Sequence, residues 1–257
     1  MNKVFPIFFI LIASLLLGSC SSTEKFSLLQ NVASTDSLAK ADFQAVLQPD
    51  DVLMIIISTD NPIVAQPYNL SAVNVASVSS EIGVMQQRQL NYQIDQEGNI
   101  QMPNIGTVKV AGKTRNELVE TIKELLVGKI TNPVITIRIL NYKISVQGEV
   151  NRPGSFPINS ERVTLLEALS MAGDLTIYGK RDNILVIREQ NGVKSFQKVD
   201  ITKGDFINSP YYYLSQNDVI YVEPNKTRVN SSVIGPNITV GLTAVSLLIT
   251  ILAITIK

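Results

Sequence analysis

The chain carries an uncharged apolar segment near each end, and these segments constrain its fold and location more than any other feature. At the start, Lys3 precedes an apolar run over residues 4–17 that closes on a Leu-Gly-Ser-Cys sequence at 17–20. At the finish, residues 236–256 contain no charged side chain. We therefore expect a folded body that works against a membrane and is held there at both ends.

The N-terminal run has the pattern of a secretory signal peptide over residues 1–19. Its apolar stretch is too short to span a bilayer core of roughly 30 Å. The small residues before Cys20 resemble a bacterial lipobox, which would make Cys20 the lipidated, palmitate-bearing first residue of the mature chain. Cys20 is the only cysteine, so it cannot form an internal disulfide. The polar tail at 21–24 favours lipidation over an ordinary signal peptide beside a stray cysteine.

The C-terminal run, residues 236–257, is expected to form a transmembrane helix. At roughly 1.5 Å per residue, residues 237–257 would form a helix of about 31 Å. Four hydroxyl-bearing residues fall on one face of this helix: Thr239, Thr243, Ser246 and Thr250. The stripe could serve close packing between helices, or it could face a water-filled lumen. Both alternatives require further helices, most simply those of other copies of the chain.

Composition excludes several classes of function. Lys+Arg and Asp+Glu balance at 22 each, so no basic field would attract nucleic acid. There is no histidine, which removes Ser–His and Cys–His nucleophile pairs and most zinc sites. We therefore expect no metal and no cofactor, and an enzyme would have to work with carboxylates, Lys or Tyr.

Two further clusters of residues are candidates for a catalytic or sugar-binding site. Asp50 and Asp51 are adjacent carboxylates, but neighbours on an extended chain point to opposite faces, so a turn or cap before a strand is favoured. The aromatic run at 211–213 could stack on sugar, although packing is the favoured interpretation. Neither cluster forms a catalytic constellation.

The pattern of the body predicts an α+β fold in two domains. Capping boxes at Thr114–Glu117 and Thr164–Glu167 each predict a helix start. Alternation predicts strands at 52–57, 134–140 and 143–150, a hairpin over 92–102, a second hairpin turning at 190–192, and a last strand at 214–222. Residues 60–89 are expected to be a long loop or insertion. The second unit has the strand, helix, strand order of a β-grasp fold.

The motifs occur in a characteristic order. Residues 51–57, 92–114 and 132–137 resemble the polysaccharide-export (PES) domain, and residues 146–188 resemble the SLBB domain that follows it. The structural markers of the PES motif are Pro49, Asp51, Gly98, Pro103, Gly106 and Gly112. Those of the SLBB motif are Gly148, Pro153, Gly154 and Gly173.

The predicted organisation follows from these motifs. The chain would comprise a signal peptide (1–19), a lipidated tether (20–44), a PES domain (45–141), one β-grasp-like SLBB domain (142–223), a linker (224–235) and the C-terminal transmembrane helix (236–257).

With its lipobox, the chain resembles Wza-type outer-membrane polysaccharide export lipoproteins. This resemblance implies a ring-shaped homo-oligomer, an octamer in its best-known member, whose body lies in the periplasm and whose C-terminal helices cross the bacterial outer membrane. It also implies a polysaccharide chain as cargo and an inner-membrane polysaccharide co-polymerase/tyrosine kinase as partner. It favours lumen lining for the hydroxyl stripe. Longer members carry two SLBB copies where this chain shows one.

Two main hypotheses follow. The first is a non-enzymatic translocon component that exports capsular or extracellular polysaccharide through a periplasmic ring and helical pore. The alternative is a periplasmic glycan-binding or scaffold lipoprotein whose terminal helix is only an anchor. A third, a glycan enzyme that works with carboxylates, has no supporting motif.

Overall fold

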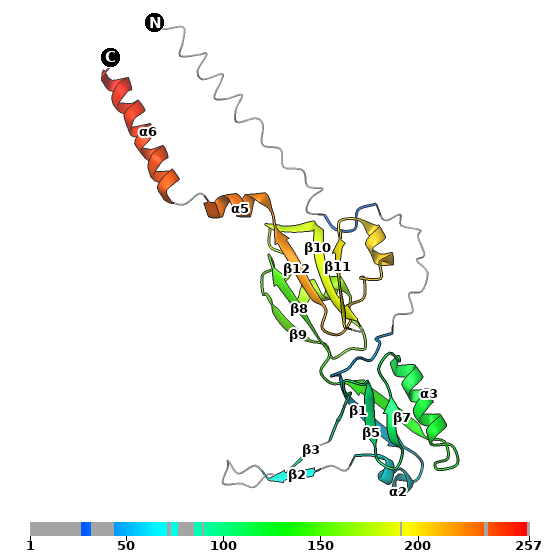
Figure 1. Cartoon of the computed structure of the whole chain (residues 1–257). Coiled ribbons are helices and arrows are strands. Elements are labelled where there is room, and N and C mark those ends of the chain that lie inside the picture. The colour runs from blue at the N-terminus through cyan, green and yellow to red at the C-terminus, as the bar shows by residue number, and fades with distance from the viewer. Residues whose placement is uncertain are drawn as a thin grey trace.

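The computed structural model describes residues 27–31, 44–70, 73–76, 85–88, 90–190, 192–233 and 236–255. The predicted signal peptide and Cys20 lie outside these ranges. Figure 1 shows two modules end to end, with the helices α5 and α6 continuing from the second. We call residues 44–141 the first module and residues 142–224 the second module, because each contains its own buried core cluster.

The first module is built on a three-stranded antiparallel sheet. Its central strand β1 (Val52–Ser58) lies between β4 (Tyr92–Gln93) and β7 (Val134–Ile139). Alternate β1 side chains, from Leu53 to Ile57, are buried, as expected for a strand with one face on the core.

Helix α3 (Arg115–Leu125) covers this core. Thr114 accepts a hydrogen bond from the backbone N–H of Glu117, and the Glu117 carboxylate accepts one from the backbone N–H of Thr114, so the predicted capping box is confirmed. Leu118 and Ile122 of α3 are completely buried. Their spacing of four residues places both on the face turned to the sheet.

The predicted hairpin over residues 92–102 is wrong in its pairing. The chain turns at 95–99, but β5 (Asn99–Met102) pairs with β6 (Gly106–Lys109), whereas β4 pairs with β1. The two arms therefore separate after the turn. Their partners in other parts of the sequence, rather than the turn, determine the ladders.

The segment expected as a loop contains short elements. Helix α2 (Pro62–Ala65) is followed by the 3₁₀ turn η2 (Gln66–Tyr68). Strands β2 (Val73–Ala76) and β3 (Met85–Arg88) then form an antiparallel hairpin that extends sideways from the first module (Figure 1).

The second module contains a five-stranded mixed sheet in the order β11-β10-β12-β8-β9. The strands are β8 (Lys143–Gly148), β9 (Gly154–Pro157), β10 (Gly179–Gln190), β11 (Val193–Val199) and β12 (Val219–Pro224). The predicted hairpin at 190–192 is confirmed by the β10–β11 ladder. The last strand, β12, pairs in parallel with β8 and antiparallel with β10, so it lies at the centre of the sheet.

Helix α4 (Leu165–Met171) contributes to the core of this module. Its predicted capping box between Thr164 and Glu167 is confirmed. Leu165, Ala168 and Leu169 are buried in the cluster that the sheet also lines. The 3₁₀ turn η3 (Gly204–Asn208) adds the buried side chain of Phe206.

A short part of the expected tether contacts the second module. The backbone N–H groups of Leu29 and Gln30 donate to the carbonyls of Ile201 and Thr202, at 3.2 and 2.6 Å. The side chain of Leu29 packs against the core cluster of the second module. Residues 27–31 therefore lie beside the second module before the chain enters the first.

The C-terminal part of the predicted fold is corrected by the structure. Residues 224–235 contain helix α5 (Lys226–Val233), and α6 (Pro236–Thr255) follows. Among the described residues, no helix combines the length and the apolar character needed to cross a membrane. The expected C-terminal transmembrane helix is therefore wrong. Asn237 and a hydroxyl-bearing residue about once per turn interrupt the apolar sequence of α6.

Candidate functional site

The marker positions of the first module form its turns. Gly98 has a φ of +81°, and an added Cβ there would lie 2.5 Å from the Cβ of Ala111, so only glycine fits. Gly106 and Gly112 also adopt positive φ. The two prolines, Pro49 and Pro103, lie in the turns before β1 and between β5 and β6.

Asp51 is a buried carboxylate at the start of β1, with 1% of its surface exposed. Its Oδ2 accepts a hydrogen bond from the backbone N–H of Gln48 at 2.9 Å, which closes the turn before the strand. Burial raises the pKa of Asp51 from 3.8 to about 6, although the hydrogen bonds from Gln48 and the Gln216 side chain oppose this change. Within the described ranges, the groups that act on the Asp51 carboxylate are the donors Gln48 and Gln216 and the neighbouring carboxylate of Asp50, none of which is a cation.

Two amide side chains join the modules at the linker between them. Asn141 Oδ1 accepts from the backbone N–H of Val52, and Asn141 Nδ2 donates to the carbonyl of Asp50, both at 2.9 Å. From the second module, Gln216 accepts from the backbone N–H of Lys143 and donates to the carbonyl of Asn141, both at 2.8 Å. Each amide uses both its donor and its acceptor, so the linker is fixed from both sides.

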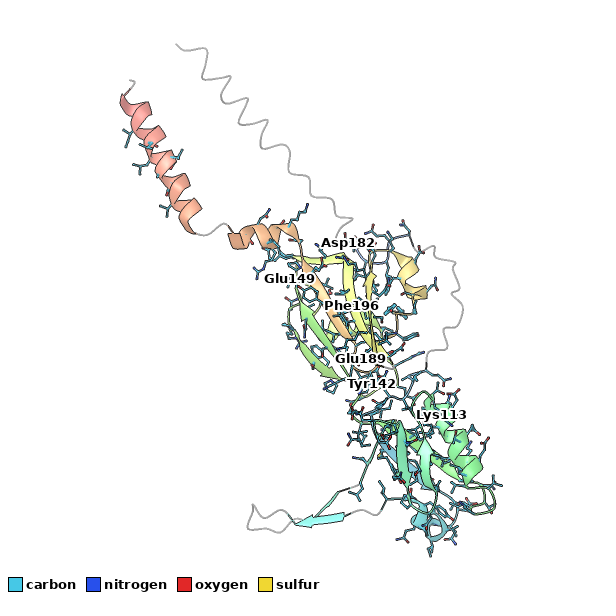
Figure 2. All side chains as sticks on the ribbon, viewed as in Figure 1. Lys113, Tyr142, Glu149, Asp182, Glu189 and Phe196 are labelled. Carbon is cyan, nitrogen blue, oxygen red and sulfur yellow. The ribbon has the colours of Figure 1, made fainter. Side chains whose placement is uncertain are left out.

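Figure 2 shows Tyr142 at the same junction. Its hydroxyl donates to the carbonyl of Leu214 at 2.6 Å, and burial raises its pKa above the ordinary range for tyrosine. Across the junction, Arg115 of α3 forms an ion pair with Glu161 of the second module. The Arg115–Glu161 pair therefore adds to the contacts that the two amides make between the modules, while the hydroxyl of Tyr142 fixes the first residue of the second module.

The marker positions of the second module also have structural roles. Gly148 has a φ of +89°, and an added Cβ would lie 2.1 Å from the carbonyl oxygen of Val222, so β8 and β12 approach closely only because this residue is glycine. Gly173 adopts a φ of +73° just after α4. Pro153 and Gly154 lead the chain into β9.

A buried ion pair connects β10 to the turn before β12. Arg188 Nη2 lies 2.7 Å from Asp218 Oδ2, and Arg188 Nε donates to both carboxylate oxygens. Asp218 also accepts from the backbone N–H of Ser215 at 2.7 Å, and Arg188 donates to the carbonyl of Tyr213 at 2.9 Å. The charges are thus paired and hydrogen-bonded, as a buried pair requires.

The tyrosine rings at 211–213 contact other side chains of the second module. The guanidinium of Arg188 lies 4.7 Å from the ring centroid of Tyr211, and that of Arg162 lies 5.3 Å from the centroid of Tyr213. Tyr212 packs beside Phe206 at 5.5 Å between centroids. The three tyrosines therefore pack within the module, as the sequence favoured.

A cavity of about 230 Å³ lies in the first module, between the separated arms β4 and β5. Its lining combines buried or half-buried large side chains with polar side chains that are exposed or half-buried. The large side chains are those of Leu70, Tyr92 and Ile100. The polar part comprises Asn91, Gln93, Asp95, Asn99 and Gln101.

A larger cavity, of about 380 Å³, lies beside α5, with Glu149 and Arg228 in its lining. Its charges are already paired, since Arg228 Nε donates to Glu149 Oε1 at 3.1 Å. The guanidinium of Arg228 also lies 5.6 Å from the ring centroid of Tyr178. These contacts hold α5 against the end of the second module.

The candidate lumen-facing residues of α6 make contacts within their own helix. Thr243 Oγ1, Ser246 Oγ and Thr250 Oγ1 each donate to a carbonyl three or four residues earlier, at 2.8 Å. The side chain of Thr239 lies outside the described part of the structure, as does Cys20. Their roles in a lumen and in lipidation stay predictions.

No cluster in the described ranges contains three or more His, Cys, Asp or Glu residues that could hold a metal ion. Asn141 and Gln216, which join the two modules, are polar residues that sequence reasoning missed. Their partners lie 73 to 91 residues away in sequence, so no local motif marks them.

Comparison with known families decides the relationship of the chain. The family profile described as "Polysaccharide biosynthesis/export protein" matches residues 39–140, and the SLBB domain profile matches residues 142–222. The chain belongs to the polysaccharide export family. The resemblance drawn from the motifs is therefore confirmed at the level of the family.

Curated relatives agree with this assignment. "EPS I polysaccharide export outer membrane protein EpsA" of Ralstonia solanacearum is 30% identical over 218 residues, which are 81% of this chain and 56% of the relative. The protein of the same name from Ralstonia nicotianae is 33% identical over 145 residues, 54% of this chain and 37% of the relative. "Exopolysaccharide production protein ExoF" of Rhizobium meliloti is 29% identical over 89 residues, 33% of this chain and 21% of the relative. The chain thus spans about half or less of each relative's length.

Proposed function

We propose that this protein is an outer-membrane component of a translocon that exports capsular or extracellular polysaccharide. The observation that carries the proposal is the ordered succession of the two family domains over residues 39–222. The names of the Ralstonia relatives, which specify polysaccharide export and the outer membrane, support it. Because the chain spans only part of those relatives, its activity as a whole protein belongs to this proposal.

The assembled form is part of the same proposal. Copies of the chain form a homo-oligomeric ring, eight by family resemblance, with the body in the periplasm and an acylated Cys20 in the outer membrane. The partners are the polysaccharide cargo and an inner-membrane co-polymerase/tyrosine kinase. The helical pore is not retained, because it required a membrane-spanning C-terminal helix. The rigid connection between the modules supports a ring, since repeated copies need a defined shape.

The proposed role is transport without catalysis. The family is one of export proteins rather than enzymes. The two buried carboxylates, Asp51 and Asp218, accept hydrogen bonds from the protein itself, which is a structural use. The chain also lacks histidine, the commonest general base.

Deletion of the coding sequence in the native host tests the export role. We expect surface polysaccharide to be lost and to return when the wild-type chain is supplied in trans. A Cys20→Ser variant tests the anchor, and it should restore less polymer and fractionate away from the outer membrane. Undiminished surface polysaccharide after deletion would reject the export role and favour the periplasmic scaffold.

Native mass spectrometry of the detergent-extracted, lipidated protein tests the ring. We expect a closed homo-oligomer with one dominant stoichiometry. A monomer at every concentration tested would reject the ring, whatever the result of the deletion.

A further inference from the structure

We propose that the cavity between β4 and β5 binds an uncharged, hydroxyl-rich segment of the polysaccharide chain. This inference rests on the proposed function for the class of ligand. The cavity, its lining groups and its charge come from the first module itself.

The cavity follows from the way the two arms of the turn diverge. Asp95 and Asn99 remain joined, because the backbone N–H of Asp95 donates to the carbonyl of Asn99 and the Asp95 carboxylate accepts from the N–H of Asn99. Beyond this point β4 follows β1, and β5 follows β6. No ladder joins β4 to β5 within the described ranges, so the space between them stays open. Its 230 Å³ would hold about eight waters at roughly 30 Å³ each, which is the scale of one sugar residue.

The polar lining offers groups that hydroxyl ligands use. Within the described part of the chain, no hydrogen bond involves the side-chain amides of Asn91 and Asn99. Each amide carries one acceptor oxygen and a two-proton donor, which suits the adjacent hydroxyls of a sugar. Gln101 is held in place by Thr107, to whose Oγ1 it donates at 2.8 Å.

The backbone of β4 adds further groups. The N–H of Ile94 donates to the carbonyl of Asp51, toward β1. Because alternate residues of a strand direct their backbone groups to opposite edges, the N–H and C=O of Gln93 are directed to the edge that faces β5. A ligand between the arms would therefore meet a donor and an acceptor of the main chain as well.

Tyr92 is the buried polar residue of the cavity. It is 4% exposed, and its hydroxyl has almost no solvent-accessible surface. Burial raises the pKa of Tyr92, and a hydrogen bond with the backbone of Leu70, which also lines the cavity, lowers it in part. Tyr92 therefore contributes its buried ring to the lining, and the polar groups offered to a ligand are the side-chain amides and the backbone of β4.

The charge of the cavity selects the kind of glycan. Asp95 is the one charged residue among those that line it. Nearby, Asp50 accepts from the side chain of Gln96, and Lys109 donates to the carbonyl of Glu97. The carboxylates of Asp50, Asp95 and Glu97 outnumber the single ammonium of Lys109 among these groups, so the surface around the turn carries an excess of negative charge. An anionic uronate would be repelled, whereas a neutral sugar would not.

Titration of the purified full-length chain with defined oligosaccharides tests the site. The probes are three neutral hexasaccharides, made of glucose, mannose or galactose, and hexagalacturonate as the anionic counterpart. We expect saturable binding of at least one neutral probe in calorimetry, and at least tenfold weaker binding of hexagalacturonate. If no neutral probe binds, or if hexagalacturonate binds as tightly, the proposal is overturned.

Variants locate the binding. Replacing Asn91 and Asn99 together by Ala removes two side-chain contacts and should weaken binding roughly thirtyfold. Gln197→Ala is the matched control, because Gln197 is an exposed amide on β11 of the second module. If the double variant misfolds, Asn99→Asp keeps the size of the side chain but removes its two-proton donor, so it should weaken binding of the neutral probe as well. Wild-type affinity in a folded variant would overturn the proposal.

Surface polysaccharide in the complemented deletion host separates this inference from the proposed function. If deletion abolishes export but the purified chain binds none of the probes, the site is rejected and the export role stands. If deletion leaves export unchanged while the neutral probe binds at Asn91 and Asn99, the site stands and the export role is rejected.

Discussion

Each module buries one aspartate, and the two residues differ in how they are stabilised. Asp218 in the second module is completely buried and lies 2.7 Å from the guanidinium of Arg188. Asp51 in the first module is buried almost as deeply, but its donors are the backbone of Gln48 and the side chain of Gln216. Burial raises the pKa of both carboxyl groups, and only Asp218 has a cation that opposes this change.

The difference separates a fixed contact from one that responds to pH. An arginine neighbour remains charged over the physiological range, so the contact of Asp218 persists. Asp51 can gain a proton near neutral pH, because its pKa is about 6. The responsive residue is also the one at the junction, beside Asn141 and Gln216. Substitutions that act on Asp218 or on Asp51 separately test whether the two aspartates differ in this way.

The largest effect is expected from Arg188→Met. This variant leaves Asp218 buried without its cation, so we expect the unfolding free energy to fall by about 4 kcal/mol. Urea unfolding followed by circular dichroism measures the loss. The double variant Arg188→Met with Asp218→Leu should recover part of it, because no charge is then left unpaired. Equal instability of the two variants would contradict the pairing argument.

The second-largest effect is the pH dependence of the contribution that Asp51 makes to the unfolding free energy. Its folded pKa is raised from 3.8 to about 6, so the folded state binds a proton more tightly than the unfolded state. Its contribution to stability is therefore complete below pH 3.8 and is lost as the pH rises through about 6. The loss is on the order of 3 kcal/mol.

Asp51→Asn isolates this contribution. We expect the unfolding free energy of the wild type, relative to that of Asp51→Asn, to fall between pH 4 and pH 7.5, as measured by urea unfolding at a series of pH values. Other carboxyl groups affect both proteins and cancel in the difference. A constant difference across this range would show that Asp51 is ionised in the folded state throughout.

A smaller effect is expected from Gln216→Leu. The variant removes the hydrogen bonds to Lys143 and Asn141 and one donor to Asp51. We expect a loss of about 2 kcal/mol in unfolding free energy and an upward shift in the pH midpoint assigned to Asp51. Gln197→Leu, on an exposed strand, serves as the control. An unshifted pH midpoint would mean that Gln216 does not act on Asp51.

The smallest effect is expected from Lys180→Met. Lys180 and Glu223 form an ion pair of 2.8 Å near the surface, and each side chain is about one-third exposed. Solvent and salt screen such a pair, so the change in unfolding free energy should be below that of Gln216→Leu. Urea unfolding at low and high salt measures it. A loss comparable to that of Arg188→Met would remove the distinction between buried and surface pairs.

Local signals predicted the elements that local contacts stabilise. Thr114 with Glu117, and Thr164 with Glu167, marked both helix starts, because a capping box needs only four residues. The turn at 190–192 marked the β10–β11 hairpin in the same way. The buried strand β1 followed from its continuous apolar sequence.

Contacts between distant residues were not predictable. The turn at 95–99 has a strong local signal, but the choice of β1 and β6 as partners is made by strands elsewhere in the chain. The cavity exists because of that choice, so no motif marks Asn91 or Asn99 as a pair. The helix at the C-terminus is present as α6, but the prediction that it spans a membrane is wrong for another reason. A segment without charged residues is not necessarily apolar enough to cross a membrane, because uncharged polar residues lower its hydropathy.

The central position of β12 has a consequence for the order in which the second module forms. The β8–β9 hairpin and the β10–β11 hairpin have no ladder with each other, and β12 joins them. β12, the last strand to be synthesised, therefore joins the two hairpins that are synthesised before it. During synthesis, the two hairpins can pair with β12 only after residues 219–224 have been made. A truncation before residue 219 removes β12 and leaves the two hairpins unjoined.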